Sequence, residues 1–316
     1  MKSIFLLALL LLGILYGFAL DRYKIFPYRT IESLYTGLPV EGDFSLGIYE
    51  GKTPFDLNES NISNPILTKE DITDIDAGFI ADPFMIFKDD EYSLFFEILN
   101  KKDKQGDIGY ATSKNGKDWN YGEVIINEDF HLSYPYVFEW QNDYYMIPES
   151  GKDFSVRLYK ATSFPKQWEY QGNLLSGYKY TDPSIFRHND KWWMFVSTGK
   201  SNVLNLYYSD ELTKGWKAHP MNPIIKKNGH IARPSGRVIT DGDKIYRFTQ
   251  DDAPRYGIQV FAFEITELTE TTYKEKKVSE RPIVKPTGTG WNATGMHHVD
   301  PHKIDGRWIT VVDGRD

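Results

Sequence analysis

The chain of 316 residues contains no cysteine, so neither a disulfide nor a thiolate metal site can stabilise it. A buried apolar core must supply the stability, and a chain of this length can bury one. Basic residues are not in excess either, because the formal charge is −7 and no long basic run occurs. The sequence therefore lacks the electrostatic footprint of a nucleic-acid-binding protein.

Long amphipathic helical patterns are also missing, and the one long apolar run, from Ile4 to Leu20, lies at the amino terminus behind Lys2. Its length is short for a membrane span and long for the core of a signal peptide. We therefore expect residues 1–20 to be either a signal peptide or a membrane anchor. Either one places the rest of the chain outside the cytoplasm, as a secreted, periplasmic or membrane-anchored protein.

A hairpin template recurs five times along the rest of the chain. Each copy has a polar residue, usually followed by proline, then an apolar strand, an Asp/Asn/Gly turn and an aromatic strand; the copies are residues 81–97, 133–149, 181–197, 232–248 and 298–313. Further strand patterns fill the gaps, which gives units of about 40–50 residues with four strands each. Such units are the blades of a β-propeller. We predict an all-β, five-bladed β-propeller over residues 75–316, preceded by a tether and ring-closing segment at 21–74.

Hairpin geometry then predicts where the polar residues lie. Counting outward from each turn places Asp82 opposite Glu97, fifteen positions later, and the same offset places Tyr134 opposite Glu149. Opposed residues have Cα atoms roughly 4.5–5.5 Å apart. The inner strands of all blades begin at one end of the central channel. Polar residues at these starts should therefore surround a single cleft, with Glu97 and Glu149 just behind; the residues at the starts are Asp82, Tyr134, Asp182, Arg233 and Asp300.

An isolated Asp-Pro step is most simply a device for starting a strand. Three such steps in register, at Asp82, Asp182 and Asp300, favour a functional interpretation. Convergent carboxylates are what acid–base chemistry on a glycosidic bond requires. One carboxylate stays ionised, and another is kept protonated so that it can donate to the leaving oxygen.

These motifs resemble glycoside hydrolase family 43 and related five-bladed families such as family 32. The resemblance rests on residues 81–83, on residues 181–186 and on the aromatic second strands. It implies that Asp82 is the catalytic base and that Asp182 tunes the acid. In family 43 the acid is a glutamate at the start of the fourth blade, where this chain has Arg233. If acid catalysis occurs, the proton donor must then be Glu149 or Glu97.

A closer resemblance covers nearly all of residues 75–316. Residues 94–97, 146–149, 233–237 and 295–300 are similar to the amino-terminal propeller domain of plant glucosamine inositolphosphorylceramide transferases, and to stand-alone bacterial relatives of that domain. The resemblance implies a carbohydrate-related propeller. It implies no transferase activity, and it brings no catalytic assignment with it.

The basic residues of the expected cleft have two interpretations. Arg233 and Arg237 could bind a carboxylate or phosphate of the substrate, or they could pair with the carboxylates around them. Adjacent residues of a strand point to opposite faces, so at most one of His297 and His298 should face the cleft. We therefore expect His298 to bind sugar or relay a proton, and we expect no metal site and no cofactor.

Two functions fit this pattern. The first is an exported glycoside hydrolase acting on an anionic or furanosidic glycan, with Asp82 as base or nucleophile, Asp182 as orienting carboxylate and Glu149 as acid. In that scheme Asp82 is expected to be the more solvated carboxylate. The second is a glycan-binding propeller without chemistry that supports polysaccharide assembly or a partner glycosyltransferase. Both have a glycan or glycoconjugate as partner, with a membrane as a further partner if the apolar run is retained, and both leave the oligomeric state open.

Overall fold

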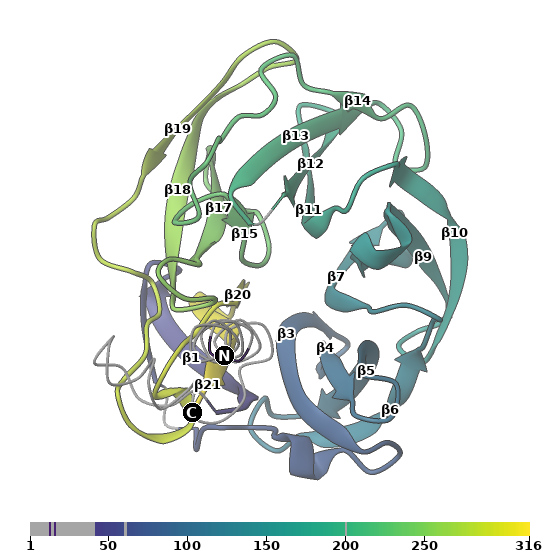
Figure 1. Cartoon of the computed structure of the whole chain (residues 1–316), viewed down its shortest axis with the longest axis vertical. Coiled ribbons are helices and arrows are strands. Elements are labelled where there is room, and N and C mark those ends of the chain that lie inside the picture. The colour runs from purple at the N-terminus through teal and green to yellow at the C-terminus, as the bar shows by residue number, and fades with distance from the viewer. Residues whose placement is uncertain (1–12, 14–15, 17–41, 60–61, 200) are drawn as a thin grey trace, which may run out of the picture. The chain divides into compact units, whose positions relative to one another are not determined.

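The structure, a computed structural model, describes residues 13, 16, 42–59, 62–199 and 201–316. Residues Asp43–Asp316 form one compact unit. Five antiparallel sheets of this unit stand around a common centre, which confirms the predicted five-bladed β-propeller (Figure 1). In the described part of the unit, helix is limited to three short 3-10 turns: η1 (Lys69–Asp71), η2 (Gly151–Asp153) and η3 (Gly290–Asn292).

The first three blades follow the chain in order, each from an inner to an outer strand (Figure 1). Blade I consists of β3 (Ala77–Lys88), β4 (Glu91–Asn100), β5 (Gln105–Ser113) and β6 (Asn120–Ile126). Blade II consists of β7 (Ser133–Trp140), β8 (Asp143–Ser150), β9 (Ser155–Ser163) and β10 (Gln167–Ser176). Blade III consists of β11 (Thr181–His188), β12 (Lys191–Thr198), β13 (Val203–Ser209) and β14 (Lys217–Ala218).

The last two blades depart from this plan. Blade IV has its inner strand split in two and consists of β15 (Arg233–Pro234), β16 (Ile239–Asp241), β17 (Lys244–Asp251), β18 (Gln259–Leu268) and β19 (Tyr273–Lys277). Blade V combines both ends of the unit and consists of β20 (Val299–Ile304), β21 (Arg307–Arg315), β1 (Phe44–Thr53) and β2 (Asp56–Glu59). Because β1 pairs with β21 from Phe44↔Arg315 onward, hydrogen bonds between the two ends close the ring.

Apolar side chains on both faces of the sheets hold the blades together. In β4 the three successive residues Leu94, Phe95 and Phe96 are all buried. Phe95 of blade I meets Trp168 of blade II edge to face, at a ring-centroid distance of 5.7 Å. Such pairs add about 0.5–1.5 kcal/mol to the burial of the rings. The blades therefore form a stiff frame for the polar groups that their inner strands carry.

The register of the inner hairpins differs from the predicted one. Glu97 pairs with Ala81 rather than with Asp82, and the register shifts before Phe84, which pairs with Phe95. Glu149 likewise pairs with Ser133, and not with Tyr134. A β-bulge inserts an extra residue on one strand, so counting outward from the turn fails beyond it. The predicted offset of fifteen was therefore wrong by one position.

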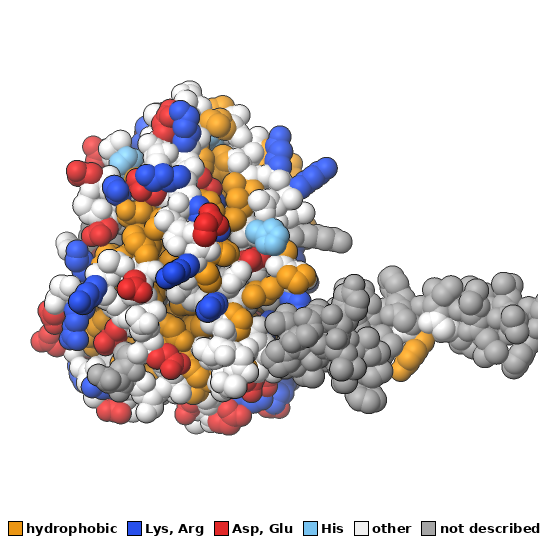
Figure 2. Space-filling view, turned by 90° about the vertical axis from the view of Figure 1, so that its left-hand side faces the viewer, with side chains coloured by type: hydrophobic (Ala, Val, Ile, Leu, Met, Phe, Trp, Pro, Cys, Tyr) orange, Lys and Arg blue, Asp and Glu red, His pale blue; other side chains and the backbone are white. Residues whose placement is uncertain are grey.

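The outer surface carries charges of both signs. Figure 2 shows the side on which blade IV and the ends of the unit lie, where basic and acidic side chains alternate. Two pairs on this blade join Lys274 to Glu267 at 2.6 Å and Lys276 to Glu264 at 3.2 Å. Exposed pairs of this kind contribute about 0–1 kcal/mol each.

The predicted signal peptide or anchor, residues 1–20, lies outside the described residues apart from positions 13 and 16. Among the residues that are described, no helix combines the length and the apolarity needed to cross a membrane. The assignment of residues 1–20 stays a prediction.

Candidate functional site: a buried carboxylate cluster

The inner strands of blades I to III each contain one residue with strained backbone. Asp82, Tyr134 and Asp182 have φ angles of 53°, 48° and 49°, and each precedes a proline inside the bulge of its blade. Left-handed backbone is uncommon outside glycine, and a following proline further restricts the residue before it. Strain of this kind costs about 1–3 kcal/mol per residue and tends to occur at functional sites.

Four carboxylates from blades I to III gather where these bulges lie. Asp82, Glu97, Glu149 and Asp182 are each less than one-tenth exposed. The pKa of Glu97 is raised well above its ordinary value, first by burial and then by the negative charges of the other three. The structure thus brings together the four acids that the sequence analysis singled out as base, acid and neighbours. We call them the carboxylate cluster.

Arg233 of blade IV is the cation of this cluster. It donates from Nε to Asp182 Oδ2 at 2.6 Å and from Nη1 to Ser201 Oγ at 3.2 Å, and its Nη2 lies 3.8 Å from Glu149 Oε2. Its guanidinium also lies over the ring of Tyr256, 5.0 Å from the centroid. Of the two interpretations of Arg233, pairing with the surrounding carboxylates is the one the structure displays.

Glu149 has the environment of a protonated acid. Burial raises its pKa well above the ordinary value, Asp182 raises it further, and Arg233 acts in the opposite direction. Asp182 already accepts hydrogen bonds from Arg233 and from Gln250 Nε2, the latter at 2.8 Å. A neutral carboxyl group beside a paired carboxylate can donate its proton to a third group.

Asp82 lies deeper than expected. Its exposed fraction is 4%, against 7% for Glu149, so the expectation that Asp82 is the more solvated acid was wrong. Burial raises its pKa to about 7, with the charges of Asp182 and Asp313 adding to the rise and that of His297 opposing it. A general base works best when its pKa lies near the working pH.

Asp313 of blade V is a member of the site that the sequence analysis missed. Its Oδ1 accepts the backbone N–H groups of His297 and His298, both at 3.0 Å, and its Oδ2 accepts that of Asp82 at 3.2 Å. Asp313 stands six residues beyond the start of the second strand of its hairpin, as Glu97 and Glu149 do. The same count identifies Gln250 in blade IV. This signal was present in the sequence.

Both histidines approach Asp82. The distance to Asp82 Oδ1 is 3.4 Å from His297 Nε2 and 3.7 Å from His298 Nδ1. The expectation that only one faces the cleft assumed a strand, but β20 begins at Val299, after both residues. Burial lowers the pKa of His298 to about 4. Asp82, His297 and Asp313 also present possible metal-ligand atoms within 4.8 Å of one another.

The remaining predicted residues form a second cluster around Asp300. Asp300 pairs with Val311 in regular β20–β21 ladder, so it does not occupy a position like that of Asp82. Arg237 donates from Nε to Asp300 Oδ1 at 2.8 Å, and His302 Nε2 lies 2.8 Å from Asp300 Oδ2. Although burial opposes it, Arg237 and His302 hold the pKa of Asp300 below its ordinary value.

Tyr134 is fully buried, and its hydroxyl serves the backbone. The hydroxyl donates to the Gly236 carbonyl at 3.0 Å, accepts the Gly236 N–H and bonds Ser184 Oγ at 2.8 Å. Gly236 has a φ of 102°, and a Cβ there would lie 1.7 Å from the Val299 carbonyl oxygen. Only glycine fits at this point, and the hydroxyl of Tyr134, a residue expected at the cleft, is bonded to this glycine.

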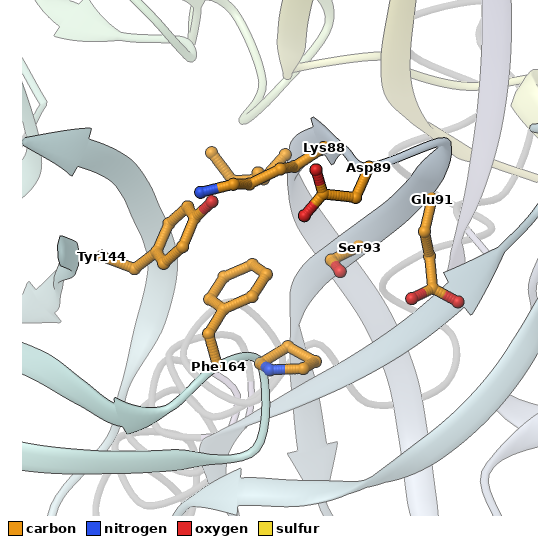
Figure 3. A pocket seen from close by; sticks show the side chains of 8 residues that line it. Lys88, Asp89, Glu91, Ser93, Tyr144 and Phe164 are labelled. Carbon is orange, nitrogen blue, oxygen red and sulfur yellow. The ribbon is translucent and has the colours of Figure 1, made fainter. Parts of the chain in front are cut away.

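A separate pocket of about 290 Å³ lies between blades I and II (Figure 3). Lys88, Asp89, Tyr144 and Phe164 are among its lining residues, and none of the carboxylate cluster is. The rings of Tyr144 and Phe164 stack at 3.9 Å. This pocket is therefore distinct from the candidate site.

Comparison with known proteins identifies the family of the chain. The family model described as "Glucosamine inositolphosphorylceramide transferase 1, N-terminal" matches residues 38–315. The chain is 32% identical to glucosamine inositolphosphorylceramide transferase 1 of Oryza sativa subsp. japonica, over 96% of this chain and 43% of the relative. The protein of that name from Arabidopsis thaliana is also 32% identical, over 87% of this chain and 39% of the relative. The chain thus spans about two fifths of the length of these curated relatives.

Solved structures share the fold at low sequence identity. A family 117 glycoside hydrolase of Zobellia galactanivorans is 15% identical with a TM-score of 0.54, and the match covers 87% of this chain and 90% of that one. An exo-β-1,3-galactanase of Clostridium thermocellum is 15% identical with a TM-score of 0.56, over 66% of this chain and 51% of that one. These similarities show the propeller fold alone, because fold does not determine function.

Proposed function

The chain belongs to the family of amino-terminal domains of glucosamine inositolphosphorylceramide transferase 1, and we propose that it is a carbohydrate-active propeller that hydrolyses a glycosidic bond. The observation that carries the proposal is the carboxylate cluster. In it Glu149 and Asp82 have raised pKa values within one buried site, while Asp182 is held by Arg233. Acids in unequal environments are what acid–base chemistry at a glycosidic bond requires.

The proposed reaction assigns one role to each acid. Protonated Glu149 donates its proton to the leaving oxygen as the bond to the sugar's anomeric carbon breaks. Asp82, with a pKa of about 7, takes a proton from the attacking water, whose oxygen forms the new bond to that carbon. Asp182 orients Arg233 beside Glu149, and the charge of Arg233 limits how far burial raises the pKa of Glu149.

The substrate we propose is an anionic or furanosidic glycan, met outside the cytoplasm. The apolar run at residues 1–20 supports export. The name of the relatives, glucosamine inositolphosphorylceramide transferase 1, refers to an inositol phosphate group and supports an anionic glycoconjugate. The carboxylate cluster lies beside a strong cation, Arg233, and the raised pKa values of its acids Glu97 and Glu149 reduce their negative charge.

A screen of the full chain against polysaccharides tests the proposal, with reducing-sugar release and binding measured in parallel. On the glycan that is cleaved, Glu149→Gln should lower kcat about 10²–10⁴-fold while affinity stays close to that of the wild type. Wild-type turnover by Glu149→Gln would exclude Glu149 as the acid. The same substitution at Glu97 then becomes the next test.

A second candidate function is binding without chemistry. Arg233 stands where the resemblance to family 43 would put the catalytic glutamate, and it fills the cluster with a cation. If glycans bind and no sugar is released, and if Arg233→Ala destroys the binding, the propeller is a glycan-binding module. It would then present the glycan to a partner glycosyltransferase.

A further inference from the structure

Two loops of blades II and III flank the carboxylate cluster. The turn η2 (Gly151–Asp153) starts two residues after Glu149, and residues 177–180 end two residues before Asp182. The loops touch, because Gly177 N–H donates to the Phe154 carbonyl at 2.8 Å. A Cβ on Gly151 would lie 3.1 Å from Lys179 Cγ and 3.4 Å from Glu149 Oε1. The chain thus brings both loops to the edge of the cluster.

These loops carry unpaired positive charge. Lys152 and Lys179 are both exposed, and among the described residues neither ammonium has a carboxylate within ion-pair distance. Nearby, His131 Nε2 lies 3.5 Å from Glu97 Oε1. Burial nevertheless lowers the pKa of His131 to about 4, and the charges of Lys152, Lys179 and Arg233 add to the effect. His131 therefore lies within electrostatic reach of both lysines, in a chain whose formal charge is −7.

The same loops expose aromatic rings. Tyr178 is 68% exposed and Phe154 is 60% exposed, which makes them the two most exposed large apolar side chains among the described residues. Phe154 also has a left-handed φ of 54°, which is uncommon for a bulky residue. Exposed rings beside a carbohydrate site offer flat apolar faces against which sugar C–H groups can pack, and such sites join apolar faces to a few polar groups.

We propose that Lys152, Phe154, Tyr178 and Lys179, here called the collar, form a subsite for an anionic group of the glycan, a phosphate or a carboxylate. The sugar units beyond the carboxylate cluster pack on the two rings, and the two ammonium groups bind the anion. Ammonium groups bind such anions as point charges and need no fixed fork geometry. The inference rests on the proposed function for the position of the glycan, and it adds the residues that bind the anionic group.

Titration of the full chain with inositol 1-phosphate and with myo-inositol tests the collar by calorimetry, because the two probes differ only in the phosphate. We expect inositol 1-phosphate to bind more tightly than myo-inositol. We expect Lys152→Ala/Lys179→Ala to reduce this ratio of affinities at least tenfold. The matched control is Lys117→Ala/Lys285→Ala, which removes two exposed lysines of blades I and IV and should bind like the wild type.

Glucuronic acid against glucose gives the same comparison for a carboxylate. Co-sedimentation with vesicles of equal parts phosphatidylcholine and phosphatidylinositol shows whether a lipid headgroup is also accepted. Equal binding of charged and neutral probes, or wild-type binding by the double lysine variant, would overturn the collar. Loss of hydrolysis in Glu149→Gln with collar binding intact separates the two proposals. Anion binding without hydrolysis of any glycan would refute only the proposed reaction.

Discussion

The inner strands of blades I and V both contain an Asp-Pro step, yet the two aspartates have opposite electrostatic environments. Asp82 lies in a β-bulge with a φ of 53°, and burial raises its pKa to about 7. Asp300 lies in regular ladder, where Arg237 and His302 hold its pKa below the ordinary value. Both carboxylates are buried, so burial alone does not explain the difference.

The two aspartates differ in pKa because the local backbone directs their side chains to different neighbours. The bulge turns Asp82 toward other acids, where two imidazoles are its nearest possible cations. In the regular strand Asp300 instead accepts the backbone N–H of Met85 at 2.7 Å and an N–H of the Arg237 guanidinium at 2.8 Å. One Asp-Pro step thus belongs to a site with raised pKa values, and the other is a structural ion pair.

The largest expected effect of breaking this contrast is on turnover. Asp82→Asn keeps the shape and tolerates left-handed backbone, but it removes the base, so kcat should fall about 10²–10⁴-fold. Thermal unfolding should show a folded protein. The measurement is reducing-sugar release on the glycan found by the screen. Asp300→Asn is the comparison, because any activity that it loses should reflect unfolded protein and not a missing catalytic group. Full activity of Asp82→Asn would contradict its role as the base.

The next effect is on stability and belongs to Asp300. Asp300→Ala leaves Arg237 buried without its partner, and breaking a buried pair from one side costs about 3–5 kcal/mol. Urea unfolding measures the loss. The control is Asp241→Ala, which breaks an exposed pair with Lys303 at 3.2 Å and should cost less than about 1 kcal/mol. Equal losses in the two variants would show that the buried pair adds nothing.

The fold could be predicted from the sequence because its signal is local and repeated. Each hairpin is recognised by a turn between two β-rich runs, and five copies of this unit predict a radial arrangement of blades. The closing of blade V by β1 and β21 is less visible, because the pairing joins residues at the two ends of the unit and no local pattern encodes it. Long-range pairing depends on the whole ring.

The site could be predicted only in part, for a physical reason. Four of the acids and Arg233 come together because the starts of the inner strands meet at one place. The bulges, however, depend on φ values that the sequence does not display, so the register slipped by one and Asp300 was placed with Asp82. His297 was set aside because both histidines were assumed to lie in a strand, whereas β20 begins at Val299. Asp313 was missed because its place along β21 was not compared with those of Glu97 and Glu149.

The pH dependence of stability should have opposite signs for the two aspartates. The folded pKa of Asp82 lies above its ordinary value of 3.8, so its contribution to stability is full below that value and is lost as the pH rises toward about 7. The loss is about 1.4 kcal/mol per pH unit in that window. Asp300, with a lowered pKa, contributes above its ordinary value and loses that contribution as the pH falls below it.

Urea unfolding of wild type, Asp82→Asn and Asp300→Asn across about pH 3–7 measures these signs, because this range spans the ordinary value of 3.8 for both aspartates and the raised value of about 7 for Asp82. The free energy of unfolding of Asp82→Asn relative to wild type should rise with pH in this range. The deficit of Asp300→Asn should instead grow as the pH rises through its ordinary value. A common slope for both variants would show that the two environments are alike.

The smallest effect concerns Tyr134, the uncharged member of the three strained residues. Tyr134→Phe leaves the ring and the bulge in place but removes the acceptor of the buried Gly236 N–H, and an unsatisfied buried group costs about 1–3 kcal/mol. Urea unfolding should show this loss, whereas kcat should stay within a few-fold of wild type. Tyr170→Phe is the matched control, because its exposed hydroxyl bonds only Asn173 among the described contacts, and it should cost less than about 0.5 kcal/mol. A large fall in kcat at unchanged stability would instead place the Tyr134 hydroxyl on the substrate, and the three bulges of blades I to III would then serve catalysis together.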